Sequence, residues 1–154
     1  MKELKVVIPK EEYSIFEFSR ENLPAIMVMN NSLSDFKPKD AFPWHLSIII
    51  QFDTLIDNGM PAQSETDLSI PFEENIDVQL KGTDENKPNA LFLARKTWNG
   101  IRELIYRVHD PEMANNVLQN IIENKTYSKE FEYNMELDKK WELNKWHLEQ
   151  LKIK

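Results

Sequence analysis

An Asn-Gly pair at positions 99 and 100 is the feature that most constrains how this chain can fold. Both central residues of a type I′ turn need a positive φ, which Asn and Gly tolerate, so Asn-Gly between alternating apolar residues predicts a β-hairpin. The register that follows brings opposite charges and apolar side chains together across the strands, pairing Trp98 with Ile101, Lys96 with Glu103, and Leu93 with Tyr106. A shifted register would lose this agreement, so we expect a hairpin over residues 91–108.

Apolar and polar residues alternate in two segments that flank the hairpin, residues 44–53 and 131–137. Such alternation is typical of strands that pack on a core through one face. The outer face of the second segment is acidic, because Glu132 and Glu136 alternate with its apolar residues. Both segments are therefore predicted to be strands of the sheet that contains the hairpin.

Two helices are predicted between these strands and the hairpin. The first lies within residues 65–80 and has an apolar stripe at helical spacing, formed by Phe72, Ile76 and Leu80. We expect Pro71 in the first turn of this helix, because proline in a helix interior removes a hydrogen bond. Asp110 and Pro111 begin the second helix, since an aspartate N-cap and a proline at the first helical position are both favourable there.

The two ends of the chain add elements to this core. Residues 13–20 and 25–30 predict an amino-terminal hairpin, and residues 31–42 read as a long surface loop. A helix is expected from residue 138 onward, but its apolar residues do not form one stripe, so either it contacts two surfaces or its end is irregular. The sequence thus predicts an α+β protein: a ferredoxin-like split βαβ sandwich, an antiparallel sheet with helices mainly on one face, extended by the hairpin and the last helix.

Length, composition and charge limit what kind of protein this is. A chain of 154 residues with 41% hydrophobic content is expected to form a single domain, residues 1–154, with the ferredoxin-like core at about 43–137. There is no cysteine, which excludes disulfides and thiolate chemistry. The net charge of −7 disfavours direct binding of nucleic acid and of anionic membranes and suits a protein partner with a basic surface. No secretory signal or membrane-spanning stretch is evident, so a cytoplasmic location is expected.

Several short motifs resemble a known family. They are the turn at residues 59–61, the hairpin turn followed by Arg102 and Tyr106, the Asp110-Pro111 helix start, and the strand at 131–138 followed by Trp141. Together they resemble the uncharacterised bacterial family called domain of unknown function six-nine-five, which is grouped with the regulator of ribonuclease activity B. The resemblance implies a ferredoxin-like fold. The regulator binds and inhibits an RNA-degrading endonuclease, whereas the first family has no assigned activity, and a shared fold does not carry function with it.

Two cations are predicted on an apolar face of the hairpin. In the register above, Arg95 and Arg102 share the face of Leu91, Leu93, Leu104, Tyr106 and Val108. One interpretation is a binding site for an anion or a carboxylate-ended ligand at Arg95, Arg102 and Tyr106, because paired guanidinium groups suit such a ligand. The other is that each arginine pairs with an acid from a neighbouring helix or extends past the sheet edge.

The opposite face of the hairpin and the acidic strand are candidates for contact with a partner. Trp98 and Ile101 lie together near the turn, where they either form an exposed docking patch or pack beneath a terminal helix. Glu130 and Glu132 either bind a basic partner or are a solvated sheet surface. The candidate partner-binding residues are Trp98, Glu130 and Glu132.

No catalytic or metal-binding signature is present in the sequence. His45, His109 and His147 lie in separate elements without the spacing of metal ligands. With three glycines, the chain has neither a nucleophile elbow nor a phosphate-binding loop, although a catalytic carboxylate pair stays open. We therefore expect a non-enzymatic binding or regulatory domain that acts by protein contact, without a cofactor. The alternative is a binder of small anionic ligands, or a weak hydrolase, with a site between the hairpin and residues 31–42 that uses Arg95 and Arg102 to hold an anion. An exposed sheet edge also permits a homodimer.

Overall fold

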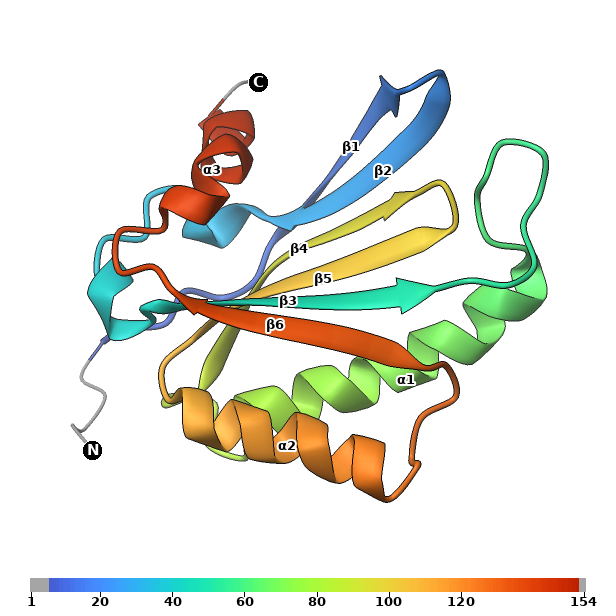
Figure 1. Cartoon of the computed structure of the whole chain (residues 1–154). Helices are drawn as coiled ribbons and strands as arrows, with labels where there is room; N and C mark the ends of the chain where they lie inside the picture. Colours follow the sequence, from blue (N-terminus) through green and yellow to red (C-terminus); the bar gives the residue numbers. More distant parts are fainter. Residues whose placement is uncertain (1–5, 153–154) are drawn as a thin grey trace.

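The computed structural model describes residues 6–152 and contains one six-stranded antiparallel sheet with three α-helices (Figure 1). The strands follow the order β1-β2-β4-β5-β3-β6 across the sheet. The elements are β1 (Tyr13–Arg20), β2 (Leu23–Asn30), β3 (Trp44–Gln51), α1 (Gln63–Lys81), β4 (Ala90–Trp98), β5 (Ile101–Val108), α2 (Pro111–Glu123), β6 (Phe131–Leu137) and α3 (Lys145–Lys152). This combination confirms the α+β class. None of the helices in the described part of the chain is long and apolar enough to span a membrane.

The central hairpin confirms the predicted turn. Asn99 and Gly100 have φ values of 47° and 77°, and the β4–β5 ladder pairs Trp98 with Ile101 and Lys96 with Glu103. The cross-strand ion pair between Lys96 and Glu103 is 3.7 Å long. The Asn-Gly turn therefore sets the register of the half of the hairpin that is closest to it.

The other half of the hairpin differs from the prediction at Leu93. A β-bulge shifts the register, so Phe92 rather than Leu93 lies opposite Tyr106, and Ala94 lies opposite Ile105. A bulge adds one residue to one strand and so changes the face to which the residues before it point. The prediction that Leu91 and Leu93 share a face with Arg95 was therefore wrong, because both belong to the core cluster on the opposite face.

Helices α1 and α2 lie against one face of the sheet, which we call the helix face (Figure 1). Its core is formed by side chains from both helices and from strands β3, β4 and β5, including Leu46, Ile48, Phe72, Ile76, Tyr106 and Leu118. Helix α2 begins where predicted, with the Asp110 carboxylate accepting hydrogen bonds from the backbone N–H groups of Glu112 and Met113. This helix and the strands around it thus follow the local sequence signals closely.

Helix α1 is longer than predicted, and this corrects the position of Pro71. The helix starts at Gln63, so Pro71 lies in its interior rather than in its first turn. Contacts with other elements hold the additional turns: the buried Glu65 carboxylate accepts hydrogen bonds from the N–H groups of Asp53 and Thr54 and pairs with Lys129 at 2.8 Å. Tertiary contacts therefore offset the hydrogen bond that proline removes.

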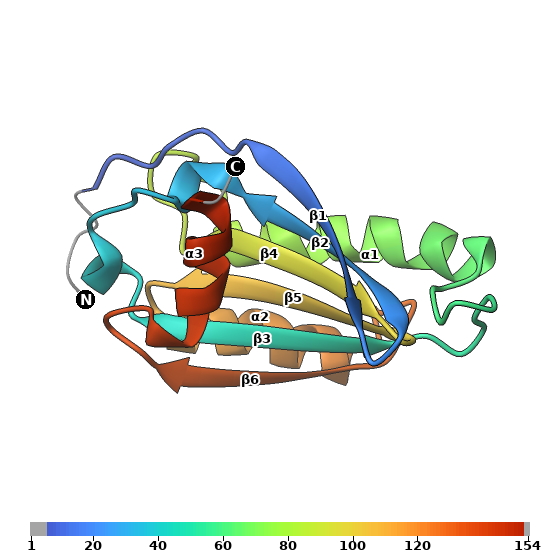
Figure 2. The same ribbon diagram turned by 90° about the horizontal axis from the view of Figure 1, so that it is seen from above.

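The opposite face of the sheet is partly covered by the two ends of the chain. Figure 2 shows α3 crossing over one end of the strands, while the β1–β2 hairpin twists across the other. The loop at residues 31–42 folds back into this layer, and its Phe36 and Phe42 are buried beside Trp141. The expectation that this loop borders a site at Arg95 and Arg102 was therefore wrong, because no residue of 31–42 lines the cavities beside Arg95. The last helix is shorter than predicted, because Trp141 has a positive φ of 61° and a 3₁₀ turn precedes α3.

Candidate functional site

A groove lies between α1 and the strands β2, β4 and β5 on the helix face. It consists of two adjoining cavities of about 510 and 250 Å³, both of which are bordered by Val28 and Arg95. Apolar side chains form much of its wall: Ile26, Val28, Met60, Val78, Phe92 and Leu104. We call it the arginine groove, because Arg95 and Arg102 are the cations that line it.

One carboxylate, that of Glu73 on α1, contacts both arginines. The Arg102 guanidinium donates to Oε2 of Glu73 at 2.8 Å, while that of Arg95 lies 3.5 Å from Oε1. Arg102 also donates from Nε to the Thr97 hydroxyl at 3.0 Å, and its guanidinium lies 5.2 Å from the centre of the Phe52 ring. Arg102 and Glu73 are both buried, so this pair belongs to the interior of the protein.

Arg95 has fewer hydrogen-bond partners than Arg102. Its long contact with Glu73 is the one hydrogen bond found for its guanidinium in the described part of the chain, and 34% of its side chain is exposed to the groove. Burial lowers the pKa of Arg95, and repulsion from the Arg102 guanidinium lowers it further. A guanidinium has five N–H donors, so Arg95 has capacity for an additional anionic partner.

A second polar network borders the groove at Tyr106 and Asp77. The Tyr106 hydroxyl donates to Asp77 at 2.7 Å, and Lys81 binds both Asp77 at 2.8 Å and Glu11 at 2.9 Å. Burial, together with the Asp77 carboxylate, raises the pKa of Tyr106 well above its ordinary value. The Tyr106 proton is therefore held in place, and this residue shapes the groove rather than exchanging protons.

The structure thus places the three predicted ligand-binding residues together, but with different surroundings. Arg102 donates to Glu73 and Tyr106 donates to Asp77, while Arg95 faces the cavity. The acids Glu73 and Asp77 were missed in the sequence analysis. A signal for them was present, since they are four residues apart and fall next to Phe72 and Ile76 on the apolar stripe of α1.

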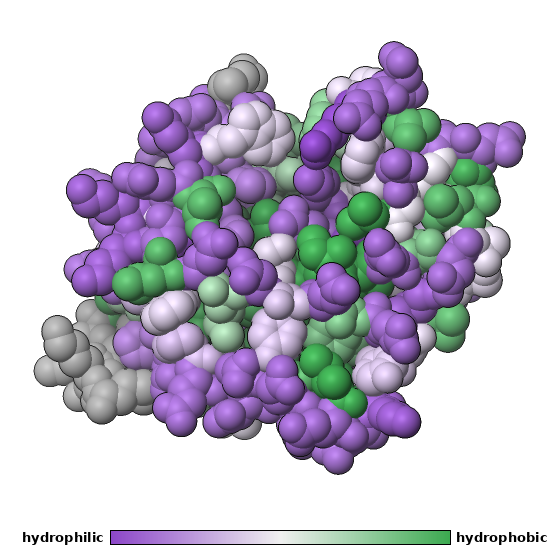
Figure 3. Space-filling model, viewed as in Figure 1, coloured by the Kyte–Doolittle hydropathy of each residue, from purple (hydrophilic) through white to green (hydrophobic). Residues whose placement is uncertain are grey.

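The predicted partner-binding residues lie on the opposite face of the sheet. The β4–β5 and β3–β5 ladders place Trp98, Ile101 and Gln51 in one row across three strands. Glu130 precedes β6 and lines the same cavity as Gln51. Glu130 and Glu132 are exposed. Figure 3 shows a hollow at the top of the molecule, between the lobe around α3 and the tip of the β1–β2 hairpin.

Trp98 is attached to the β1–β2 hairpin rather than to a terminal helix. Its indole Nε1 donates to the Arg20 carbonyl at 2.9 Å, and the Arg20 guanidinium lies 4.7 Å from its ring centre. Trp98 is half-buried by this contact. The expected packing beneath the helix that carries Trp146 is not the arrangement found, because Trp146 contacts Phe18 instead.

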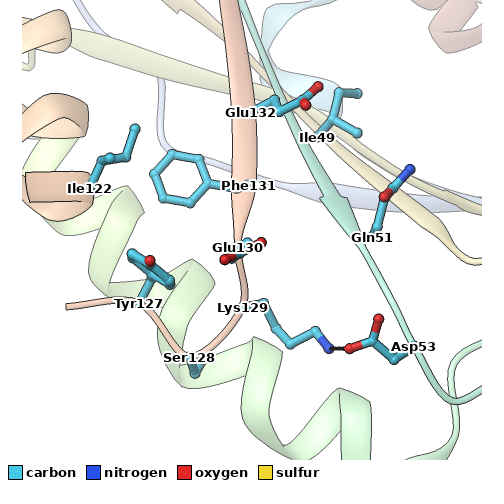
Figure 4. Close-up of a pocket in the computed structure, with 10 residues that line it drawn as sticks. All are labelled: Ile49, Gln51, Asp53, Ile122, Tyr127, Ser128, Lys129, Glu130, Phe131 and Glu132. Atoms are coloured by element: carbon cyan, nitrogen blue, oxygen red, sulfur yellow. Dashed lines mark hydrogen bonds and ion pairs between the residues drawn. The ribbon is translucent and has the colours of Figure 1, made fainter. Parts of the chain in front are cut away.

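A cavity of about 600 Å³ lies where β3 ends and β6 begins (Figure 4). Its lining contains both predicted glutamates: Ile49, Gln51, Asp53, Ile122, Tyr127, Ser128, Lys129, Glu130, Phe131 and Glu132. Lys129 reaches Asp53 at 3.0 Å and the buried Glu65, and these contacts raise its pKa. Within residues 6–152, no group of three or more His, Asp or Glu side chains is arranged to hold a metal ion.

Beneath α3, a fully buried arginine holds the carboxyl end of the described chain. The Arg107 guanidinium donates to the Asp138 carboxylate at 3.1 Å, to the Asn144 side chain at 2.9 Å and to the Asp138 carbonyl at 2.5 Å. It also lies 4.9 Å from the centre of the Trp141 ring. Burial lowers the pKa of Arg107 to about 10, which leaves it charged at neutral pH.

The family model described as "Family of unknown function (DUF695)" matches residues 12–146. The chain belongs to this family. The match confirms the resemblance to domain of unknown function six-nine-five and covers the hairpin, the arginine groove and the Arg107 cluster. No curated protein and no solved structure gives a match.

Proposed function

We propose that this DUF695 protein is a binding domain whose arginine groove holds a ligand with an apolar body and one anionic group. The observation that carries the proposal is the sharing of Glu73 between two guanidinium groups, which leaves Arg95 with a single 3.5 Å contact at the wall of a cavity. Ligand sites are mostly apolar concave surfaces with a few polar groups that fix orientation. The groove has this composition.

The groove supports binding rather than catalysis. Ser69 donates to Glu73, but Ser69 is fully buried and so cannot reach a substrate. Glu73 is engaged by two arginines, and Asp77 by Tyr106 and Lys81, so neither carboxylate is available as a general base. These residues position a ligand instead of transferring a proton.

A thermal-shift titration with octanoate tests the proposal, with octanamide as the neutral counterpart. A ligand that binds only the folded state raises the melting temperature as its concentration increases. We expect octanoate to raise it more than octanamide, and Arg95→Gln to abolish the difference. Lys96→Gln is the matched control, because Lys96 is the next residue of β4, points to the other face and pairs with Glu103. Equal shifts for the two compounds, or an unchanged shift in Arg95→Gln, would contradict the proposal.

The second candidate function is contact with a basic protein partner through the opposite sheet face. It is favoured by the ladder register, which places Trp98 in one row with Ile101 and Gln51, and by the cavity that Gln51 lines together with Glu130. Reversing two charges with Glu130→Lys and Glu132→Lys tests it: a partner retained by the original protein should be lost by the double variant and kept by Arg95→Gln. Retention by all three proteins would exclude this face.

We also infer that β3, α1, β4, β5, α2 and β6 form a ferredoxin-like unit. Its support is the order β4-β5-β3-β6, which is expected when two strand-helix-strand segments interleave in one antiparallel sheet. The relation to the regulator of ribonuclease activity B and the cytoplasmic location stay predictions. A solved structure with a different connection between α1 and β4 would remove the ferredoxin-like assignment.

A further inference from the structure

The two edge strands of the sheet, β6 and β1, differ in how well they could pair with an additional strand. Strand β6 carries Glu132 and Glu136 on one face, and Glu130 precedes it. If two β6 strands paired antiparallel around Asn134, each Glu132 would lie opposite a Glu136, and like charges directly opposite are destabilising. This edge is therefore protected against pairing with a second copy of itself.

The edge formed by β1 carries less of this protection. Within residues 6–152, β1 pairs with β2 alone, and its sequence from Tyr13 to Phe16 is uncharged. Ile15 is 69% exposed and Tyr13 is 57% exposed. A long edge strand with exposed apolar side chains is a template for another strand.

The backbone of β1 is oriented for such pairing. Arg20 and Leu23 flank a two-residue turn in which Glu21 and Asn22 both have positive φ, so Arg20 and alternate residues before it direct their N–H and C=O groups toward β2. Ile15, Glu17 and the other odd-numbered residues must then direct theirs outward. The outer edge thus presents a regular set of free donors and acceptors.

We propose that a second copy of this chain pairs with β1, so that two six-stranded sheets join antiparallel around a two-fold axis at Phe16. In this register, Phe16 lies opposite its symmetry mate, and Glu12 lies opposite Arg20 of the other copy, twice by symmetry. Neither Glu12 nor Arg20 forms an ion pair within residues 6–152, although the Arg20 guanidinium covers the Trp98 ring. Both side chains therefore have charge available for the partner copy.

Charge complementarity selects this register over its neighbours. Moving the axis to Ile15 would place Lys10 opposite Arg20, and moving it to Glu17 would place two glutamates opposite each other. Both alternatives bring like charges together. Beyond the strand, Glu11 would approach Glu21, but the Glu11 carboxylate is already held by Lys81 at 2.9 Å. A dimer formed by one strand pair is small, so its dissociation is measurable at ordinary protein concentrations.

Sedimentation velocity over a concentration series tests the proposal with charge-reversed variants at exposed positions. Glu12→Arg places Arg opposite Arg20 of the other copy, and Arg20→Glu places Glu opposite Glu12, so we expect each variant alone to dimerise about tenfold more weakly than the original chain. An equimolar mixture of the two variants restores both opposite-charge pairs and should dimerise again. The double variant Glu12→Arg/Arg20→Glu should do the same, with its charges exchanged.

A substitution that weakens folding or the Arg20–Trp98 contact does so in the mixture as well as in the separate variant. Recovery of the dimer in the mixture therefore reports strand pairing and not these other effects. Glu132→Arg, at the other edge, is the matched control and should leave dimerisation unchanged. A chain that stays monomeric at the highest concentration overturns the proposal. So does a dimer that both single variants leave intact, a mixture that stays monomeric, or a dimer that depends on Glu132.

Discussion

Arg95 and Arg107 lie on neighbouring strands but on opposite faces of the sheet, and their surroundings differ. Arg107 is fully buried and has Asp138, Asn144 and a backbone carbonyl as close partners. Arg95 is partly exposed and shares the carboxylate of Glu73 with Arg102. Arg107 Nε lacks a partner among the described residues, but both terminal nitrogens of the guanidinium donate within the protein, so the two arginines differ in how much hydrogen-bonding capacity is left for a ligand.

The largest effect that tests this comparison is the loss of Arg107. Arg107→Met leaves the nearly buried Asp138 carboxylate without its cation, so we expect the free energy of unfolding to fall by about 3–5 kcal/mol. Urea unfolding measures the loss. Hydrogen exchange should show that amides from residue 138 onward lose protection first. The exposed Lys140→Met is the control and should change the value by less than about 0.5 kcal/mol. A small loss in Arg107→Met would mean that Arg107 is not the anchor of this segment.

The second prediction concerns pH and the same carboxyl-terminal layer. Burial lowers the pKa of His147 from 6.5 to about 4, and its Nδ1 has no hydrogen-bond partner among the described residues. Between these two pH values the unfolded chain binds a proton that the folded chain does not. Stability should therefore decrease as the pH falls from 6.5 to 4, by on the order of 3 kcal/mol.

Urea unfolding at a series of pH values checks the pH prediction. His147→Leu removes the titrating group, so the stability of this variant should depend less on pH in that window. At still lower pH, Asp138 contributes in the same direction. Burial raises its pKa, but hydrogen bonds from the N–H of Leu143 and from Arg107 outweigh burial and keep the pKa below its ordinary value. If His147→Leu retained the whole pH dependence, the His147 explanation would be wrong.

Glu73→Gln should have a smaller effect on stability. The substitution keeps a hydrogen-bond acceptor for Arg102 but removes the negative charge between the two guanidinium groups, and we expect a loss of about 2 kcal/mol. The variant also frees both guanidinium groups for an anion, so octanoate should stabilise it more than it stabilises the original protein. Melting temperatures with and without octanoate give both quantities. No gain in the octanoate effect would show that the ligand does not approach these arginines.

The smallest effect is expected for Arg95 itself. Its side chain is about one third exposed and its contact with Glu73 is long, so solvent screens the pair and Arg95→Gln should cost less than about 1 kcal/mol. Urea unfolding measures this value beside that of Arg107→Met. Similar losses in the two variants would remove the distinction between a structural and a binding arginine.

The sequence predicted those parts of the fold that depend on local signals. Neighbouring residues alone are enough to predict three features that the structure contains: the Asn99-Gly100 turn, the Asp110 cap and the apolar face of β3. The bulge at Leu93 carries no comparable signal, because an inserted residue is stabilised by what packs on both faces. The helical interior position of Pro71 was missed for a similar reason, since contacts of Glu65 with distant segments extend α1.

For the candidate site, the sequence predicted the two arginines but not the carboxylate that binds them. Alternation along β4 and β5 was enough to place Arg95 and Arg102 on one face. Whether each is satisfied depends on Glu73, which approaches from a helix twenty-two residues earlier than Arg95, and short-range patterns do not specify that approach. Trp98 was placed on the correct face, but its contact with Arg20 joins residues 78 positions apart.

The bulge at Leu93 has one more consequence, for insertions and deletions in this strand. The single extra residue determines the face to which each side chain between the bulge and the turn points. Deleting Leu93 would therefore reverse the faces of one half of β4 relative to the other half. Keeping the turn in place would force Leu91 into the layer beneath α1, and keeping the start of β4 in place would carry Arg95 away from Glu73. The number of residues at this point of β4, rather than the identity of any side chain, determines on which face of the sheet the Arg95 guanidinium lies.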